Sequence, residues 1–175
     1  TVCYGLKITK AYHIFDKTIK TYRNAVHYIS DITMRHYDEL KSLESITGND
    51  GKVIVSAQQR RQQKMERLIH STANNDATYK RFDKEFYKFP SYLRRDAINT
   101  AVGLILSYRS QLQKWEDNGK HGRRPYLNRN QSTMPCFYRN NTFLDSEETN
   151  IVSLKLYNGK DWICLLYTSD AADDL

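Results

Sequence analysis

The spacing of apolar residues divides the chain into a strand, a helical region and a second group of strands. Val2, Tyr4, Leu6 and Ile8 alternate with small or polar residues, which predicts a strand with one buried face. From residue 15 to residue 43 the apolar positions step by three and four, which predicts one amphipathic helix over roughly 12–46. The Thr-Gly-Asn-Asp-Gly run at 47–51 is expected to end that helix.

A second helix is predicted to begin at Ser56. Gln59 stands three residues after Ser56, which is the spacing of a capping box, where each side chain bonds the other residue's backbone N–H. The polar and basic run 58–64 that follows is expected to be a solvated helix surface. Residues 71–76 are expected to form a loop.

A third and longest helix is predicted after Pro90. Aromatic residues at helical spacing over 79–89 first indicate a short helix that ends at this proline. Ser91 is expected to cap the long helix, and an apolar stripe follows over 93–115. Asn118–Gly119 is expected to end it, because glycine readily takes the left-handed conformation of a helix C-terminus.

Strands are predicted again in the last third of the chain. Residues 151–156 alternate, and Asn158–Gly159 is typical of a type I′ hairpin turn. A lone strand at 2–8 cannot satisfy its backbone groups, so it is expected to pair with the 151–164 region. The sequence therefore predicts an α+β fold, with a small β-barrel or sheet from 1–11 and 120–165 and an inserted helical bundle over 12–119.

Residues 166–175 are expected to be a non-native tail. The segment carries three Asp and no Lys or Arg, and it does not continue the strand alternation. It resembles translated sequencing-adapter read-through, although a genuine acidic tail is the alternative. We expect its deletion to leave the fold and nucleic-acid affinity intact or improved.

The charge of the chain points to an acidic partner. The 175 residues carry a net charge of +7, and residues 77–139 alone hold thirteen Lys or Arg against five acidic residues, a balance of +8. Such a basic stripe attracts polyanions, and nucleic acid is the favoured class; a merely solvated basic surface is the alternative.

Compartment and membrane contact follow from other features. Cys3, Cys136 and Cys164 are far apart and odd in number, which favours reduced thiols in a cytoplasmic protein. The longest apolar run is far shorter than a bilayer span, so no membrane contact is expected.

The basic and aromatic residues of this stripe are the candidate nucleic-acid contacts. Arginine forks onto phosphate or guanine, tyrosine stacks on bases, and asparagine reads adenine. The alternatives are pairing of the two arginines at 94–95 with Asp96 or Glu85, an ordinary basic linker at 123–130, and tyrosines buried in the sheet. The candidates are Arg94, Arg95, Arg109, Arg123, Arg124, Tyr126, Asn128, Arg129, Tyr138 and Arg139. Those between 123 and 139 are expected to form one continuous surface.

No catalytic constellation is found. The five histidines never fall in a tight metal-ligand spacing, and no nucleophile sits in a recognisable elbow. His36 occupies a position in the apolar stripe and is expected to be a core histidine rather than a metal ligand. The sequence therefore predicts no catalytic site, no cofactor and no Mg²⁺-dependent nuclease activity for this chain.

Three groups of residues, in this order, resemble the TnpB/OrfB transposase family. They are 89–98 with 103–116, then 124–129 with 134–143, and then 155–162, so that the resemblance covers roughly 85–164. It implies an RNA-guided DNA nuclease related to type V CRISPR effectors, with guide RNA and DNA as partners. It also implies a wedge-like β-barrel interrupted by a helical recognition lobe. The family's RuvC-type domain with its divalent metal, and its zinc-binding cysteine cluster, are expected only in a missing C-terminal part, which would leave this fragment inactive.

Two other function classes remain open. One is a stand-alone DNA-binding regulator with a helix-turn-helix inside 56–118, which should dimerise and read a short duplex site. The other is a helical protein–protein interaction module whose basic face is incidental. Binding by such a module should be indifferent to salt.

Overall fold

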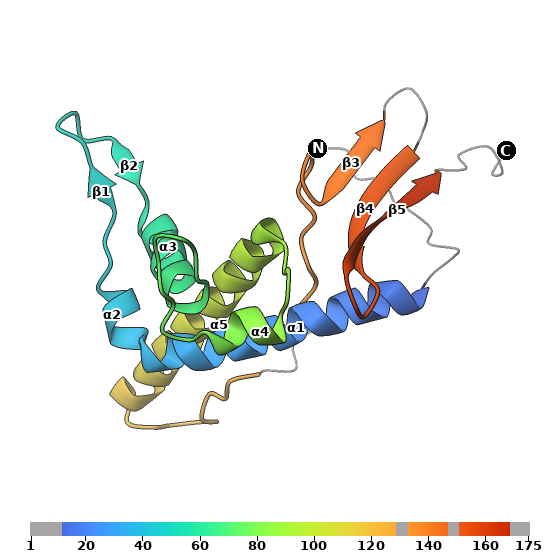
Figure 1. Cartoon of the computed structure of the whole chain (residues 1–175). Helices are drawn as coiled ribbons and strands as arrows, with labels where there is room; N and C mark the ends of the chain where they lie inside the picture. Colours follow the sequence, from blue (N-terminus) through green and yellow to red (C-terminus); the bar gives the residue numbers. More distant parts are fainter. Residues whose placement is uncertain (1–11, 129–132, 147–150, 169–175) are drawn as a thin grey trace, which may run out of the picture.

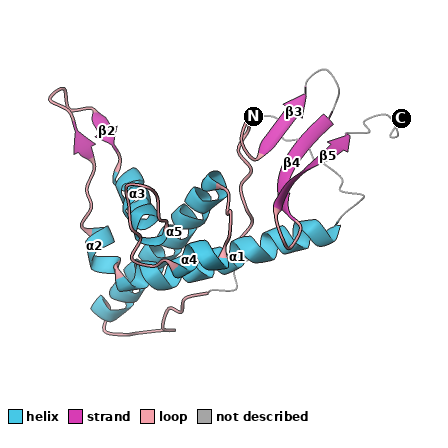
Figure 2. Ribbon diagram, viewed as in Figure 1, coloured by secondary structure: helices cyan, strands magenta, loops and turns pink. Residues whose placement is uncertain are grey.

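A computed structural model of the chain describes residues 12–128, 133–146 and 151–168, which form a mixed α and β fold (Figure 1). Helices gather in one part, a three-stranded sheet lies beside them, and a two-stranded hairpin projects from the helical part (Figure 2). The strands in these ranges form no closed barrel. Of the predicted β-barrel or sheet, the structure therefore has the sheet. The predicted strand at 2–8, and its pairing with 151–164, lie outside the described residues.

Two long helices, α1 (Tyr12–Arg35) and α5 (Ser91–Asp117), form the centre of the helical part. They run in the same direction, because the early Tyr22 contacts Asp96 while Tyr37, beyond the end of α1, contacts Arg109. Between these contacts the facing sides of both helices are apolar and buried. The core residues they contribute include Ala25, Val26, Ile29, Ile32, Leu93, Ala97, Ile98 and Ala101.

The prediction of one helix over 12–46 is wrong in its second half. The helix turns at His36, and the short α2 (Tyr37–Lys41) follows. The imidazole of His36 makes hydrogen bonds to the Tyr79 hydroxyl, at 3.0 Å, and to Glu39, at 3.1 Å. His36 is thus half-buried, and both of its ring nitrogens are bonded to other side chains of the chain.

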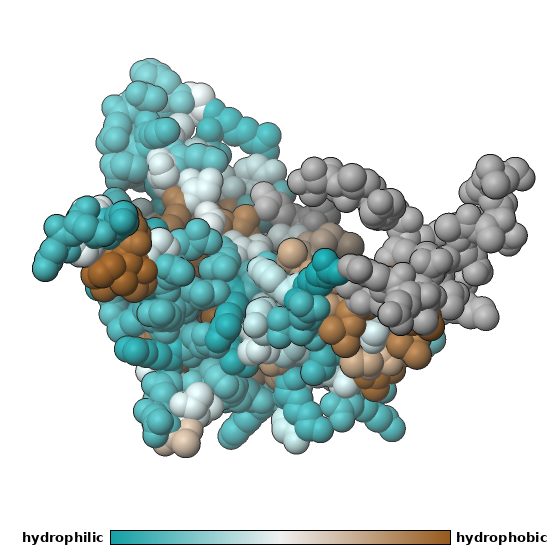
Figure 3. All heavy atoms as spheres, turned by 90° about the horizontal axis from the view of Figure 1, so that it is seen from above, coloured by the Kyte–Doolittle hydropathy of each residue, from teal (hydrophilic) through white to brown (hydrophobic). Residues whose placement is uncertain are grey.

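A β-hairpin follows where a simple helix-ending loop was expected. Strand β1 (Ile46–Thr47) pairs antiparallel with β2 (Val53–Val55). The hairpin projects from the helices, and its side chains Ile46, Val53 and Ile54 are exposed. Figure 3 shows these apolar residues gathered on the projecting hairpin.

Helix α3 (Ala57–Ile69) begins with the predicted capping box, which is confirmed. The Gln59 amide donates to Ser56 Oγ at 3.2 Å, and the Ser56 amide donates to Gln59 Oε1 at 2.9 Å. Part of its polar run is not simply solvated, because Arg61 donates to the carbonyls of Leu40 and Leu43. These bonds satisfy carbonyl groups where α2 ends.

The aromatic stripe after α3 packs into the core. Phe82 lies in α4 (Arg81–Glu85), and Phe86 and Phe89 follow; all three are buried. Ser91 was expected to cap the next helix, but it does not. Pro90 holds the cap position in an extended conformation, no side chain bonds to the cap, and Ser91 is already the first helical residue.

The sheet consists of β3 (Phe143–Ser146), β4 (Ile151–Tyr157) and β5 (Trp162–Thr168), paired antiparallel in that order. The hairpin predicted at Asn158–Gly159 is confirmed, but its turn is not the two-residue type I′. Tyr157 pairs with Trp162, so the loop spans 158–161, and the Asn158 side chain accepts the amides of Lys160 and Asp161.

The last strand extends into the segment predicted to be a tail from residue 166. Strand β5 continues to Thr168, with Leu166 opposite Ser153 and Thr168 opposite Ile151. Backbone pairing needs no alternation of side chains, so the lack of alternation in 166–168 hid these last strand residues. Residues 169–175 lie outside the described part of the chain.

The sheet is attached to the helices through Thr18 of α1. The Thr18 hydroxyl accepts a hydrogen bond from the Tyr157 amide of β4 at 2.8 Å and donates to the Ile14 carbonyl at 2.8 Å. Thr18 is buried, and Leu156 beside this junction is fully buried. This hydroxyl is one of several contacts between the two parts, which also include Lys17 donating to the Asn158 carbonyl at 3.0 Å and the Phe89 ring 5.3 Å from that of Trp162.

We expect Thr18→Val to lower the free energy of unfolding by about 1–3 kcal/mol, because it leaves the Tyr157 amide without its acceptor. Urea unfolding followed by circular dichroism measures the change. Thr18→Ser keeps the hydroxyl and should recover most of the loss. A larger loss in Thr18→Ser than in Thr18→Val would show that the methyl group, rather than the hydrogen bond, holds the junction.

Candidate nucleic-acid interface

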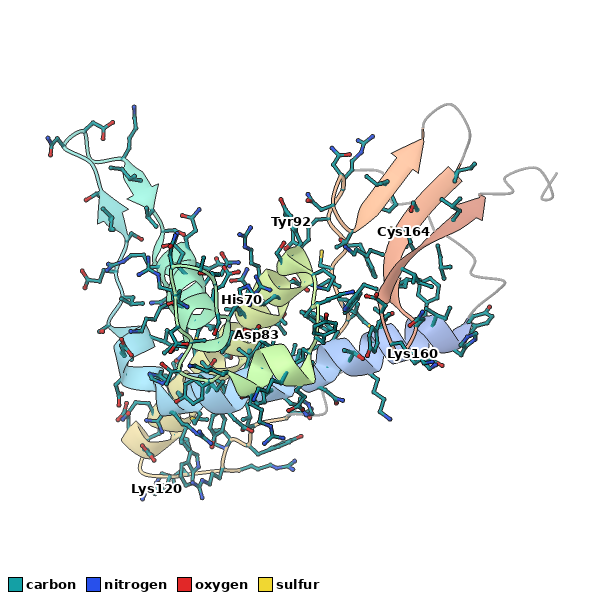
Figure 4. The ribbon with its side chains drawn as sticks, viewed as in Figure 1. His70, Asp83, Tyr92, Lys120, Lys160 and Cys164 are labelled. Atoms are coloured by element: carbon teal, nitrogen blue, oxygen red, sulfur yellow. The ribbon has the colours of Figure 1, made fainter. Side chains whose placement is uncertain are left out.

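The predicted contact residues lie in two groups at opposite ends of α5, so they do not form one continuous surface. Figure 4 places Tyr92 at one end of this helix and Lys120 just beyond the other. The helix has 27 residues, which corresponds to roughly 40 Å at 1.5 Å per residue. The two groups therefore have to be considered separately.

The chain reverses direction directly after α5. The Gly119 amide donates to the Glu116 carbonyl, and the Lys120 amide donates to the Trp115 carbonyl, which is the pattern of a Schellman motif. Gly119 has a φ of 69°, as predicted for the residue that ends this helix. The following segment returns to the helix, where the Trp115 indole donates to the Gly122 carbonyl at 3.3 Å.

Three guanidinium groups lie over aromatic rings at this end of the helix. The distances from guanidinium carbon to ring centroid are 4.6 Å for Arg109 over Tyr37, 5.4 Å for Arg123 over Tyr126, and 5.9 Å for Arg124 over Trp115. Each distance is within the range of a cation–π contact. Within the described ranges none of the three arginines has an ion pair with a carboxylate, so their charge stays available to an anionic ligand.

The three rings differ in exposure. Tyr37 is 9% exposed and lies beneath Arg109, so its ring belongs to the core. Trp115 is half-buried, whereas Tyr126 is 65% exposed. We name the set of Trp115, Arg123, Arg124 and Tyr126 the α5 C-terminal cluster; Tyr126 is its most exposed ring.

Arg94, at the other end of α5, is removed from the candidate surface. Its side chain is only 9% exposed, and its guanidinium group donates to Glu66 at 3.0 and 3.3 Å and to the Phe89 carbonyl at 3.4 Å. The expected phosphate contact is therefore corrected to an internal ion pair. The partner is Glu66 of α3, neither of the two acids considered from sequence, because only the packing of α3 on α5 places it there.

Arg95 remains on the surface. Its side chain is 47% exposed, 3.6 Å from Glu66, and over the ring of Tyr92 at 5.7 Å. The Tyr92 ring in turn contacts Tyr138 with centroids 5.6 Å apart. This end of α5 thus carries an exposed arginine and two neighbouring tyrosines.

Asp96 fixes the chain two residues before Tyr138, through the Cys136 amide. One oxygen of Asp96 accepts the Tyr22 hydroxyl at 2.6 Å and the Cys136 amide at 3.0 Å. Burial, and secondarily this carboxylate, raise the pKa of the Cys136 thiol and of the Tyr138 phenol. Cys136 is therefore kept as a thiol, which disfavours a nucleophilic role.

The remaining candidates are less informative. Asn128 and Arg139 are exposed. Arg139 forms an isolated backbone β-bridge with Phe143, the first residue of β3. Arg129 lies outside the described residues. Segment 133–138, which leads to Tyr138, is tied to α1 by Arg23, which donates to the Thr133 carbonyl at 2.9 Å.

The described connections within 56–118 do not match a helix-turn-helix. Helices α3 and α4 are joined by 70–80, and α4 and α5 by 86–90, whereas this motif uses a turn of roughly three to four residues. In the described ranges no three His, Cys, Asp or Glu side chains lie together as a metal site. Nor does any helix there have the length and apolarity needed to cross a membrane.

Three residues important for these surfaces were missed as candidates. The apolar stripe over 93–115 predicted Trp115 to be a core residue. Its place in the last turn before Asn118–Gly119 could have indicated that it is partly exposed. Tyr92 precedes the arginine pair, and an aromatic ring at this position is itself a signal for a nucleic-acid contact. Glu66 gave no local signal, because its role depends on contacts between helices distant in sequence.

The chain matches a known protein family. The model of a family described as the Aq_aa04 family matches residues 2–158, which is most of the chain. No curated protein and no solved structure matches.

Proposed function

We propose that this chain, which belongs to the Aq_aa04 family, binds nucleic acid and forms the N-terminal part of a TnpB-like RNA-guided nuclease. Its partners in this proposal are a guide RNA and DNA. Cleavage, the divalent metal and the zinc site belong to other parts of the longer protein. The chain itself supplies binding surface rather than chemistry.

The observation that carries the binding proposal is the α5 C-terminal cluster. Arg123 and Arg124 are exposed, lie on aromatic rings, and have no ion pair among the described carboxylates. Guanidinium groups in this state can bind phosphate without first giving up an internal partner. The ring beneath each one limits its motion, which lowers the entropy lost on binding.

The link to TnpB-like proteins rests on the motif resemblance over roughly 85–164. The helical part that follows residue 12 and the sheet after residue 142 support it at a coarse level. The connection lengths within 56–118 weigh against a helix-turn-helix regulator. A salt-dependent affinity would weigh against the protein-interaction alternative.

We expect Arg123→Ala and Arg124→Ala each to weaken binding of an RNA hairpin with a single-stranded tail. Each should lower the slope of log affinity against log salt by about one unit, because one phosphate contact is lost. Fluorescence anisotropy of the labelled RNA, titrated over a salt series, measures both quantities.

The matched control is Arg81→Ala. Arg81 is 77% exposed and pairs with Glu85 in α4, so its removal changes the net charge equally but not the proposed site. Its salt slope should stay that of the unaltered chain. Absence of RNA binding by the unaltered chain, or equal effects of all three substitutions, would contradict the proposal.

A further inference from the structure

We infer that the α5 C-terminal cluster binds unpaired nucleotides, with a base stacked on Tyr126, rather than a continuous duplex. This inference rests on the proposed function and specifies its substrate class. It depends on the planar shape of the exposed Tyr126 ring and on which of its faces Arg123 covers.

The Tyr126 ring has one face available. Arg123 lies over the ring at 5.4 Å, and a guanidinium group can cover only one of its two faces. The residue is nevertheless 65% exposed, so a large part of the ring surface meets solvent. A planar base can stack there, with the guanidinium charge on the far side of the ring.

The phosphate contacts lie beside this ring. Arg124 is two residues before Tyr126, and its guanidinium group is held over Trp115 at 5.9 Å. The indole is fixed in turn by its hydrogen bond to the Gly122 carbonyl. A stacked base and a neighbouring phosphate can therefore be bound by adjacent residues of one segment, as in grooves that bind single strands.

A duplex fits this arrangement less well. In a paired helix each base is already stacked between neighbours, and an aromatic ring reaches it only if the base is turned out, at a cost of a few kcal/mol. An unpaired nucleotide avoids most of that cost. The exposed ring thus favours loops, tails or separated strands over intact duplex.

The test compares four ligands with the full-length chain: a single-stranded RNA and a DNA of the same sequence, and the duplex of each. The single strands carry one 2-aminopurine, whose fluorescence falls when it stacks on an aromatic ring. We expect tighter binding and quenching for the single strands. The comparison of RNA with DNA shows which of the two supplies the unpaired nucleotides.

Tyr126→Leu should weaken single-strand binding roughly fivefold to a hundredfold and abolish the quenching, with the salt slope unchanged. Tyr87→Leu is the matched control, because Tyr87 is also 65% exposed beneath a cation, Lys88 at 5.4 Å, but lies before the start of α5. Circular dichroism confirms that both variants are folded.

The outcomes separate this inference from the proposed function. If the chain binds none of the four ligands, the proposed function fails. If it binds duplex as well as single strands, or if Tyr126→Leu binds single strands like the Tyr87→Leu control, nucleic-acid binding stands and this inference is overturned.

Discussion

Phe82→Ala is expected to lower the free energy of unfolding by about 3–5 kcal/mol, because it leaves a cavity at the centre of an aromatic cluster. Phe82 is 1% exposed, and its ring centroid lies 4.8 Å from that of Phe86, 5.8 Å from that of Tyr28 and 6.1 Å from that of Phe89. These rings connect α1, α4 and the start of α5. Chemical denaturation of the purified variant measures the loss.

Two further variants make this result interpretable. Phe82→Leu retains most of the apolar volume and should cost clearly less than the alanine variant. Tyr87→Ala removes an exposed ring from the same segment and should change stability by no more than about 0.5 kcal/mol. Similar losses for Phe82→Ala and Tyr87→Ala would contradict the burial of this cluster.

Glu66→Ala is expected to destabilise the fold by about 3 kcal/mol, because it leaves the guanidinium group of Arg94 buried without a counter-charge. The value is at the lower end for a broken buried pair, since Glu66 itself is 23% exposed. The Phe89 carbonyl, at 3.4 Å, remains as a weaker acceptor for Arg94. Thermal and urea unfolding measure the effect.

The adjacent arginines provide the controls for this pair. Arg95→Ala removes the exposed contact of the same carboxylate and should cost at most about 1 kcal/mol. Arg94→Met removes the buried charge and leaves Glu66, which is 23% exposed and 3.6 Å from Arg95, so this variant should cost clearly less than Glu66→Ala. It should also leave RNA affinity unchanged. A loss of affinity in a stable Arg94→Met variant would restore Arg94 as a phosphate contact.

The sequence was most informative where structure depends on neighbouring residues. The capping box at Ser56, the end of α5 at Gly119 and the hairpin near Asn158 all follow from local chemistry, and all three are confirmed. Each involves bonds within a few residues of the signal, so no knowledge of the tertiary fold was needed.

Two local details differ, the cap expected at Ser91 and the length of the turn at Asn158, but the larger errors fall where distant contacts decide. The apolar period continues through His36, and the turn there is accompanied by a bond to Tyr79, 43 positions further along. The role of Arg94 depends in the same way on Glu66, 28 positions before it. The continuation of β5 to Thr168 depends on pairing with β4, which side-chain alternation does not report.

The candidate site was anticipated in composition but not in arrangement. The arginines and tyrosine of 123–126 were identified from their residue types, and the structure places rings beneath both guanidinium groups. Their separation from Tyr138 was not foreseen. It arises because the segment after α5 turns back, so residues close in sequence reach opposite ends of the helix.

Helix α5 also fixes the distance between the residues at its two ends. Tyr92 and Trp115 belong to the same uninterrupted helix, so at 1.5 Å per residue they are held about 35 Å apart along its axis. This span is close to one turn of B-form duplex, about 34–36 Å. An oligonucleotide much shorter than ten base pairs or their extended equivalent cannot reach both ends at once. With such short ligands, substitutions at the two ends should act additively, and coupling between them should begin only at a defined ligand length.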